Sequence, residues 1–301
     1  MSLPTTEVVS EGQHIDVLSP TDAAGFLLDG QSAAIDAVRA AAHSISRASH
    51  RMAVAIGSNN SLHYAAAGSS GLMALADASE LRGTFGIPSE QIHIHMAGGV
   101  PVDAHMPGDT EDDDKAVERF SEKITAGDVV IVLTASGSTP FALAVARAAQ
   151  RKTAIVIGIA NNPGTPLLQL ADEPICIATP PEVIAGSTRL GAGTAQKAAL
   201  NLMSTLMGVE LGHVYRGEMV NVIADNAKLV RRATNMVSRI ASVSAEVAQD
   251  AITTANGQVK LAILVAAGCS LKDANTLLEQ NKGQLAPCFS SLESNRTNTS
   301  N

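Results

Sequence analysis

The sequence predicts an α/β protein: a doubly wound, mostly parallel sheet with N-terminal helices and a small C-terminal helical module. A continuous apolar run at residues 129–133 ends in the turn SGSTP at 136–140, and an amphipathic segment, 141–150, follows at once. Residues 62–67 and the turn GSSG at 68–71 repeat this order before a second helix. A buried strand, a tight turn and a helix in succession are typical of parallel sheets with helical crossovers.

The first half of the chain is expected to begin with helices and continue as alternating strands and helices. Residues 1–18 are irregular, and the helix start SPTD at 19–22 opens two mostly helical segments that reach about residue 50. Strands are expected at 62–67, 91–97, 128–134, 153–160 and 174–178, with helices near 71–80, 113–124 and 138–150. Crossovers of this length are right-handed and produce a parallel sheet.

The C-terminal part is predicted to be helical. The stretch GSTRLGAG at 186–193 interrupts the alternation, and long helices are expected at 194–211 and 219–241. Three short helices follow at 242–278, with a stop at Gly268. We therefore expect four parts: an N-terminal irregular and helical segment (1–50), an α/β domain (51–241), a C-terminal helical module (242–289) and a disordered polar tail (290–301).

Composition and charge narrow the classes of function. The 301 residues carry a net charge of −8, which disfavours nucleic acid and anionic membranes as partners. The N-terminus lacks the pattern of a signal peptide, and no apolar run approaches the ~20 residues of a membrane span. Three widely spaced cysteines argue against a disulfide framework. We expect a cytoplasmic protein with no nucleic-acid or membrane partner.

The sequence predicts neither a metal nor an organic cofactor. His93 and His95 alternate on an expected strand and His105 is nearby, but this spacing secures no third ligand. The glycines in GAG at 191–193 form only a fragment of a dinucleotide-binding motif and follow no good strand.

Hydroxyl side chains gather at two strand-to-helix turns. The first turn carries Ser69 and Ser70, and the second carries Ser136, Ser138 and Thr139. Unpaired backbone N–H groups and the positive end of a helix dipole meet at such turns, so they suit a phosphate. Helix capping and turn formation are the alternative reading and are compatible with ligand contact. Both turns lie at the carboxyl ends of expected strands, where parallel sheets bind ligands.

Several motifs occur in an order and spacing that cover most of residues 15–285. They are GSSG (68–71), LADASELRGTF (75–85), AGG (97–99), EDD (111–113), TASGSTP (134–140), NNP (161–163), GSTR (186–189), GTAQK (193–197), NLMST (201–205) and VKLAIL (259–264). With these motifs the chain resembles the N-acetylmuramic acid 6-phosphate etherases of the sugar isomerase (SIS) superfamily. The glucokinase regulatory proteins share the same architecture, so the resemblance fixes the fold more firmly than the activity.

The resemblance implies a lyase that removes the D-lactyl group from an amino-sugar phosphate, without a cofactor and as a homodimer whose pockets are completed by the partner. Glu80 matches the family's glutamate in a D-A-S-E context and would protonate the leaving group, while Glu111 matches a second glutamate and would act as the base at C2. Ring opening supplies an aldehyde that acidifies the C2 proton. Further substrate contacts are expected from residues of and around the GSTR and GTAQK motifs: Glu182, Ser187, Arg189 and Lys197.

The chain departs from the family pattern at cationic positions. Ser138 stands where the family usually has arginine, Leu72 and Met73 replace an Arg-Leu pair, and Leu190 and Gly191 replace Met-Lys. Arginine and lysine bind phosphate and carboxylate strongly. Two alternatives to the etherase reaction therefore stay open: a sugar-phosphate isomerase, and a non-catalytic regulator that binds a sugar phosphate.

Overall fold

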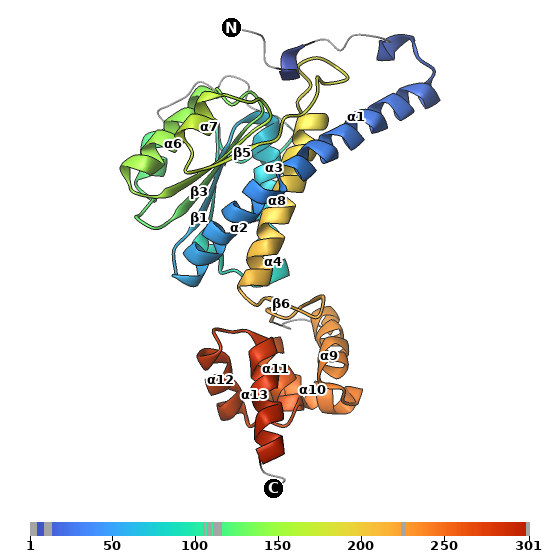
Figure 1. The fold of residues 1–301 in the computed structure, drawn as a ribbon, viewed down its shortest axis with the longest axis vertical. Coiled ribbons are helices and arrows are strands. Elements are labelled where there is room, and N and C mark those ends of the chain that lie inside the picture. The colour runs from blue at the N-terminus through green and yellow to red at the C-terminus, as the bar shows by residue number, and fades with distance from the viewer. Residues whose placement is uncertain are drawn as a thin grey trace. The chain divides into compact units, whose positions relative to one another are not determined.

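The computed structural model describes residues 5–8, 14–104, 106, 110, 116–223 and 227–298. The chain divides into two compact units (Figure 1). The first unit comprises residues 1–80 and 88–206, and the second comprises 81–87 and 207–301. Glu111 lies outside the described residues.

The first unit is built on a five-stranded parallel sheet. Its strands are β1 (Leu62–Ala66), β2 (Ile92–Met96), β3 (Val129–Thr134), β4 (Ile155–Ala160) and β5 (Glu173–Cys176). All neighbours pair in parallel, in the order β2-β1-β3-β4-β5. The chain runs from β1 outward to β2 and then returns to the other side of β1 for β3. The strand order therefore reverses between β1 and β3, and crevices for ligands form at such a reversal.

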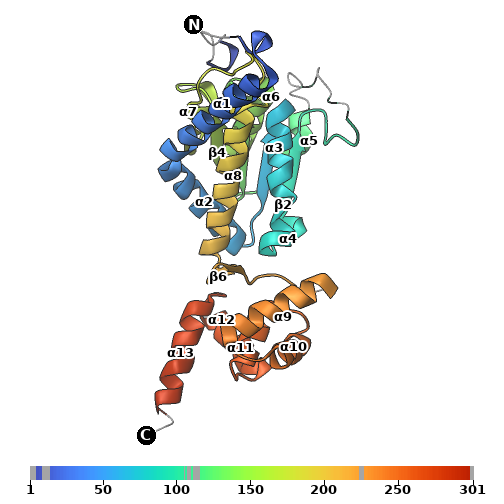
Figure 2. The same cartoon turned by 90° about the vertical axis from the view of Figure 1, so that its right-hand side faces the viewer.

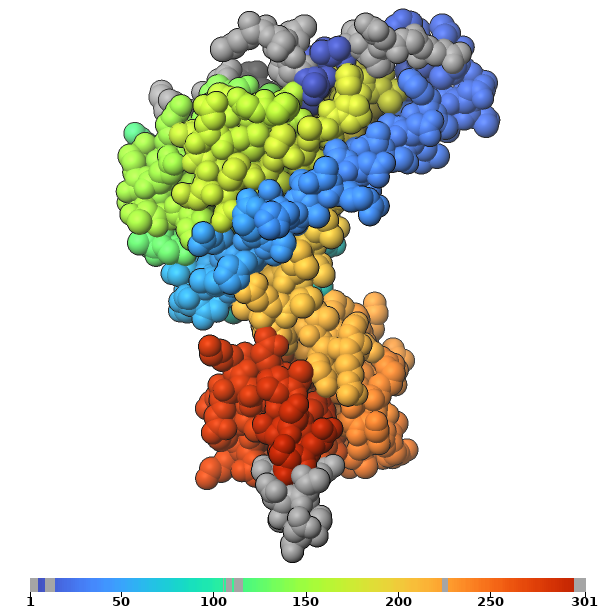
Figure 3. All heavy atoms as spheres, viewed as in Figure 1, coloured from blue at the N-terminus to red at the C-terminus, as the bar shows by residue number. Residues whose placement is uncertain are grey.

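Helices cover both faces of this sheet, so the predicted doubly wound α/β class is confirmed. On one face, α5 (Ala116–Ser121), α6 (Pro140–Arg151) and α7 (Pro166–Leu170) bury a shared apolar cluster against β1, β3 and β4. In Figure 3 the green and yellow-green atoms of this part of the chain form one side of the first unit. On the other face lie α2 (Ala42–Gly57), α3 (Gly68–Ala78) and α8 (Gly191–Glu210), which stand in front of the sheet in Figure 2.

The remaining elements of the first unit precede the sheet or join its strands. They are η1 (Thr5–Glu7), η2 (Ile15–Val17), α1 (Pro20–Ala40) and η3 (Ser89–Gln91). The expected helix start is present, because the Ser19 side chain accepts a hydrogen bond from the backbone N–H of Asp22 and Pro20 is the first helical residue.

The second unit contains a short hairpin and a set of helices around one apolar cluster. Its elements are α4 (Leu81–Phe85), β6 (Val214–Tyr215), β7 (Glu218–Met219), α9 (Ala227–Ala241), α10 (Ala245–Thr254), α11 (Val259–Ala266), α12 (Leu271–Gln280) and α13 (Leu285–Asn298). The sequence-based boundary at residue 241 falls inside this unit, because α9 contributes Met236, Val237 and Ile240 to the same buried cluster. In the stretch expected to be disordered, α13 continues through Asn298.

Among the described residues, no single helix is both long and apolar enough to cross a membrane. The pair α11 and α12, bent by 117°, satisfies the length and composition criteria together.

Candidate functional site

The two serine-bearing turns line one pocket, which we call the hydroxyl pocket. It has a volume of about 290 Å³ and lies at the carboxyl ends of β1 and β3, where the strand order reverses. Ser69 and Ser70 come from the turn after β1, and Ser136 and Thr139 come from the turn after β3. The structure therefore brings four of the predicted binding residues together, although they come from two separate stretches of the sequence.

The second turn is held by hydrogen bonds between its own hydroxyl groups. The Thr134 and Thr139 hydroxyl oxygens are 2.7 Å apart, and the backbone N–H of Ser138 donates to the Ser136 hydroxyl at 3.2 Å. Thr139 precedes α6, yet its side chain makes no capping hydrogen bond. Gly137 has a φ of +74°, and a Cβ there would collide with Thr165. These hydroxyls bond one another, and each oxygen keeps a further lone pair that a ligand can use.

The first turn opens directly into α3. Gly68, Ser69 and Ser70 form the first turn of this 11-residue helix, and the residue before it, Ala67, provides no side-chain cap. The N–H groups of a first helical turn have no partner within the helix and form a site for an anion. Gly71 packs closely on β2, because a Cβ there would stand 2.8 Å from Cε of Met96. This arrangement fits a phosphate bound between the two turns.

Glu80 does not line the hydroxyl pocket. It follows the C-terminal end of α3, its side chain is 70% exposed, and the Lys197 ammonium lies 3.5 Å from its carboxylate. Lys197 also lies 3.6 Å from the carboxylate of Asp77 and donates to Asn201 at 2.7 Å. Lys197 is thus placed beside Glu80, away from the two serine turns.

Asp77 is the buried member of the charged group that it forms with Lys197 and Glu80. It is 2% exposed and accepts hydrogen bonds from the Tyr64 hydroxyl and the Ser204 hydroxyl, each at 3.1 Å. Burial raises the pKa of Asp77, with Lys197 acting in the opposite direction. Burial also raises the pKa of Tyr64 well above its usual value. Tyr64 and Ser204 thus hold the Asp77 carboxylate, which lies beside the Lys197 ammonium.

The other predicted contacts are divided between structural and peripheral positions. Glu182 is buried, and its two carboxylate oxygens accept hydrogen bonds from the backbone N–H groups of Gly191 and Ala192, both at 2.9 Å. It therefore caps α8. Ser187, Arg189 and Ser138 are not among the residues that line the hydroxyl pocket.

Several residues that line the hydroxyl pocket were not predicted. They are Thr134, Gly186, Thr188 and the N-terminal residues Thr6 and Glu7. Thr188 stands beside the predicted Ser187 in the GSTR motif, so the motif located the loop but not the residue that faces the pocket. Nothing in the sequence around Thr6 and Glu7 distinguishes them from an irregular N-terminus.

A histidine cluster lies on β1 and β2, away from the hydroxyl pocket. The Nδ1 atom of His63 lies 3.1 Å from Nε2 of His95, and Nε2 of His63 lies 3.3 Å from the Asp128 carboxylate. Burial lowers the pKa of His63 to about 4 and that of His95 to about 3. Neutral imidazole rings satisfy both contacts if Nε2–H of His95 donates to Nδ1 of His63 and Nε2–H of His63 donates to the Asp128 carboxylate. Within the described part of the chain, no group of three or more potential ligands is placed to hold a metal ion.

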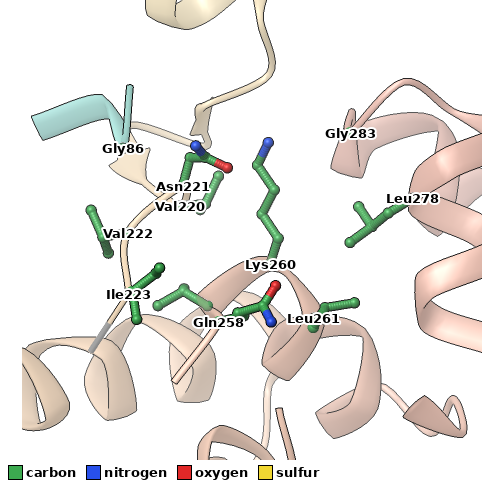
Figure 4. A pocket seen from close by; sticks show the side chains of 11 residues that line it. Gly86, Val220, Asn221, Val222, Ile223, Gln258, Lys260, Leu261, Leu278 and Gly283 are labelled. Atoms are coloured by element: carbon green, nitrogen blue, oxygen red, sulfur yellow. The ribbon is translucent and has the colours of Figure 1, made fainter. Parts of the chain in front are cut away.

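The second unit has a pocket of its own, around Lys260. It has a volume of about 320 Å³, and its lining includes Asn221, Gln258 and Leu278 (Figure 4). Figure 4 shows the Lys260 side chain extended, with its ammonium nitrogen between Asn221 and Gly283. Burial lowers the pKa of Lys260 to about 8. The described residues offer no carboxylate to pair with it.

Comparison with known proteins agrees with this architecture. The SIS domain family matches residues 105–206. A solved protein of Escherichia coli CFT073 superposes with a TM-score of 0.50 and 16% identity, over 67% of this chain and 97% of that one. The fold and the crevice between β1 and β3 thus define an α/β protein with an SIS domain.

Curated relatives identify the family within this class. An N-acetylmuramic acid 6-phosphate etherase of Deinococcus radiodurans is 39% identical over 278 residues, which are 91% of each chain. One from Geobacillus thermodenitrificans is 36% identical over 93% of this chain and 96% of its own. The chain belongs to the N-acetylmuramic acid 6-phosphate etherase family, which confirms the resemblance found in the sequence.

Proposed function

We propose that this protein cleaves the D-lactyl ether of N-acetylmuramic acid 6-phosphate and yields N-acetylglucosamine 6-phosphate and D-lactate. Membership of the etherase family supports this reaction. The single structural observation that carries it is the convergence of Ser69, Ser70, Ser136 and Thr139 on one pocket at the N-terminus of α3. This pocket offers hydroxyl and backbone donors for the 6-phosphate.

The reaction follows from the chemistry of the open-chain sugar. A base removes the C2 proton, which the aldehyde acidifies, while an acid protonates the lactyl oxygen as the bond from C3 to that oxygen breaks. The resulting unsaturated aldehyde then takes up water at C3. We assign the acid to Glu80 and the base to Glu111. No cofactor is needed in this scheme, because the aldehyde accepts the electron pair.

A homodimer would reconcile this role with the position of Glu80. Within one chain, Glu80 and the serine turn stand at opposite ends of α3, about 16 Å apart by helix rise. A second copy of the chain would bring its own Glu80 to the pocket. Leu202 and Leu206 on α8 are exposed to 43% and 39%, and apolar residues one turn apart suit a contact between copies.

The test is release of D-lactate from N-acetylmuramic acid 6-phosphate by the purified protein, measured enzymatically. Glu80→Gln is expected to lower kcat by at least about 100-fold, the usual contribution of a general acid. Glu90→Gln is the matched control, because Glu90 is also an exposed glutamate of the first unit. Full turnover by Glu80→Gln would refute the assigned acid. Conversion of an aldose phosphate to a ketose phosphate without lactate would identify an isomerase instead.

A second candidate is a regulator that binds a sugar phosphate without converting it. It is favoured by the lining of the hydroxyl pocket, in which the described residues include no lysine, arginine or histidine. Tight binding of N-acetylmuramic acid 6-phosphate without lactate release would support it. A cytoplasmic location and a role in recycling peptidoglycan sugars stay predictions.

A further inference from the structure

We propose that Glu7 is a substrate-binding residue, whose carboxylate accepts a hydrogen bond from a hydroxyl or amide N–H group of the sugar held in the hydroxyl pocket. This inference deepens the proposed function and rests on it. It assigns the sugar end of the pocket to the N-terminal turn η1, whereas the serine turns hold the phosphate.

The turn η1 is fastened to the sheet by contacts that are distant in sequence. The backbone N–H and the hydroxyl of Thr5 both donate to Oδ1 of Asn162, at 2.7 and 2.8 Å. Asn162 in turn donates to the carbonyl oxygen of Ala135, at 2.9 Å, in the second serine turn. The N–H of Gly186 donates to the carbonyl oxygen of Thr6 at 2.9 Å, and Thr6 is 1% exposed. These bonds fix the residue before Glu7 at the rim of the pocket.

Glu7 differs in chemistry from everything else at the pocket. Among the described residues that line it, Glu7 is the only ionisable one, and the others are hydroxyl-bearing, small or apolar. The described residues give its carboxylate no ion pair and no hydrogen bond. Glu7 is exposed, so water satisfies its carboxylate in the free protein. A carboxylate is an acceptor only, so a ligand that displaces this water must replace its hydrogen-bond donors.

A glycine leaves room for this carboxylate. Gly186 has a φ of +74°, and a Cβ there would stand 3.2 Å from Oε2 of Glu7. That separation is tighter than nine in ten real Cβ contacts, so a side chain at position 186 would displace the Glu7 carboxylate by a few tenths of an ångström.

The charge of Glu7 decides which part of the ligand it meets. A phosphate dianion beside an uncompensated carboxylate is repelled, whereas sugar hydroxyl and acetamido groups donate charge-assisted hydrogen bonds to it. The phosphate therefore goes to the serine turns, and the ring lies toward η1. Loss of the Glu7 charge should weaken binding of the sugar and leave the phosphate contact intact.

The experiment compares two ligands by titration calorimetry: N-acetylglucosamine 6-phosphate and inorganic phosphate. Glu7→Gln and Glu7→Ala are expected to raise the Kd of the sugar phosphate by about tenfold, the effect of one charge-assisted hydrogen bond. The Kd of inorganic phosphate should stay the same or fall. Glu7→Asp, which keeps the charge, should recover part of the loss, and Glu90→Gln should change neither ligand.

The outcomes separate this inference from the proposed reaction. The role of Glu7 would be overturned if Glu7→Gln raised the Kd of both ligands equally. It would also be overturned if the Kd of the sugar phosphate did not change. A wild-type protein that binds the sugar phosphate but releases no lactate would contradict the etherase reaction and leave the Glu7 comparison fully decisive. A wild-type protein that binds no sugar phosphate would overturn both.

Discussion

The partly buried charge of Lys260 lowers the stability of the folded protein at neutral pH. Its folded pKa is about 8, below the usual value of 10.5, so the unfolded chain binds more protons between these two values. Its contribution to the free energy of unfolding therefore rises as pH increases from about 8 toward 10.5, and it is unfavourable at neutral pH. Lys260→Met is expected to raise the free energy of unfolding at pH 7 by about 1–2 kcal/mol, because it removes a desolvated charge.

Urea unfolding at pH 7 and pH 10 measures this effect. The gain from Lys260→Met should shrink at the higher pH, where the native lysine is neutral. Lys272→Met, at an exposed position of α12, is the control and should change little. A loss of stability in Lys260→Met would mean that the ammonium has a favourable partner in the folded protein.

The histidine cluster makes the first unit sensitive to acid. Burial lowers the pKa of His63 to about 4 and that of His95 to about 3, so the unfolded chain takes up more protons than the native one below pH 6.5. The free energy of unfolding should therefore fall between pH 6.5 and 4, by roughly 1.4 kcal/mol per pH unit for each histidine.

Chemical denaturation at pH 7, 5.5 and 4.5 gives this slope. Burial also lowers the pKa of His93, and that of His213 to about 4, so His95→Gln is expected to reduce the slope without abolishing it. His43→Gln, on the exposed side of α2, should leave it unchanged. An equally steep slope in His95→Gln would show that other groups cause the loss of stability in acid.

At the scale of single residues, the sequence predicted those side chains whose position follows from local structure. Ser69, Ser70, Ser136 and Thr139 follow strands directly, so their place at the sheet edge was deducible from the order of elements. Glu7 was not, because its place depends on hydrogen bonds between Thr5 and Asn162, which are 157 residues apart. No local pattern encodes such a contact.

At the scale of elements, Glu182 has a structural role at the start of α8, and its expected ligand contact stays a prediction. The sequence suggested a ligand contact, but both carboxylate oxygens bind the first N–H groups of α8. Glu182→Ala leaves these two buried donors unpaired and is expected to cost about 2–4 kcal/mol of unfolding free energy. Glu182→Gln keeps one acceptor and should cost less. Thermal unfolding followed by circular dichroism ranks the stabilities of the wild-type protein, Glu182→Gln and Glu182→Ala.

Ligand affinity distinguishes capping from contact in these variants. If Glu182 only caps α8, Glu182→Gln should retain its Kd for N-acetylglucosamine 6-phosphate at a temperature where it is folded. A large rise in that Kd with unchanged stability would restore the ligand contact expected from the sequence.

Element boundaries were predicted less well in the C-terminal half than in the sheet. The expected ranges of all five strands agree with the observed strands within a few residues. The hairpin of β6 and β7 has only two residues in each strand, too few for a recognisable alternation. The helix α13 extends through a polar stretch, where composition favours disorder.

For the whole molecule, the fold class could be predicted because the strand–turn–helix order and the sheet topology agree. The catalytic arrangement could not be predicted in the same way, because in our proposal it depends on a second copy of the chain. Glu80 and the hydroxyl pocket are separated along α3 in one chain, so the proposed role of Glu80 implies that it serves the pocket of a second copy. This requirement can be tested without a structure of the assembly.

Two inactive variants should recover activity when their subunits are mixed. Glu80→Gln keeps an intact hydroxyl pocket, and a variant with Ser69→Ala and Ser136→Ala keeps an intact Glu80. If Glu80 serves the partner's pocket, half of the randomly mixed dimers contain one complete site of two, so roughly a quarter of the wild-type lactate release should return. If Glu80 serves its own chain, every site in the mixture lacks one part, and no activity should return. Mixing after mild denaturation and refolding, with each variant treated alone as the control, distinguishes the two arrangements.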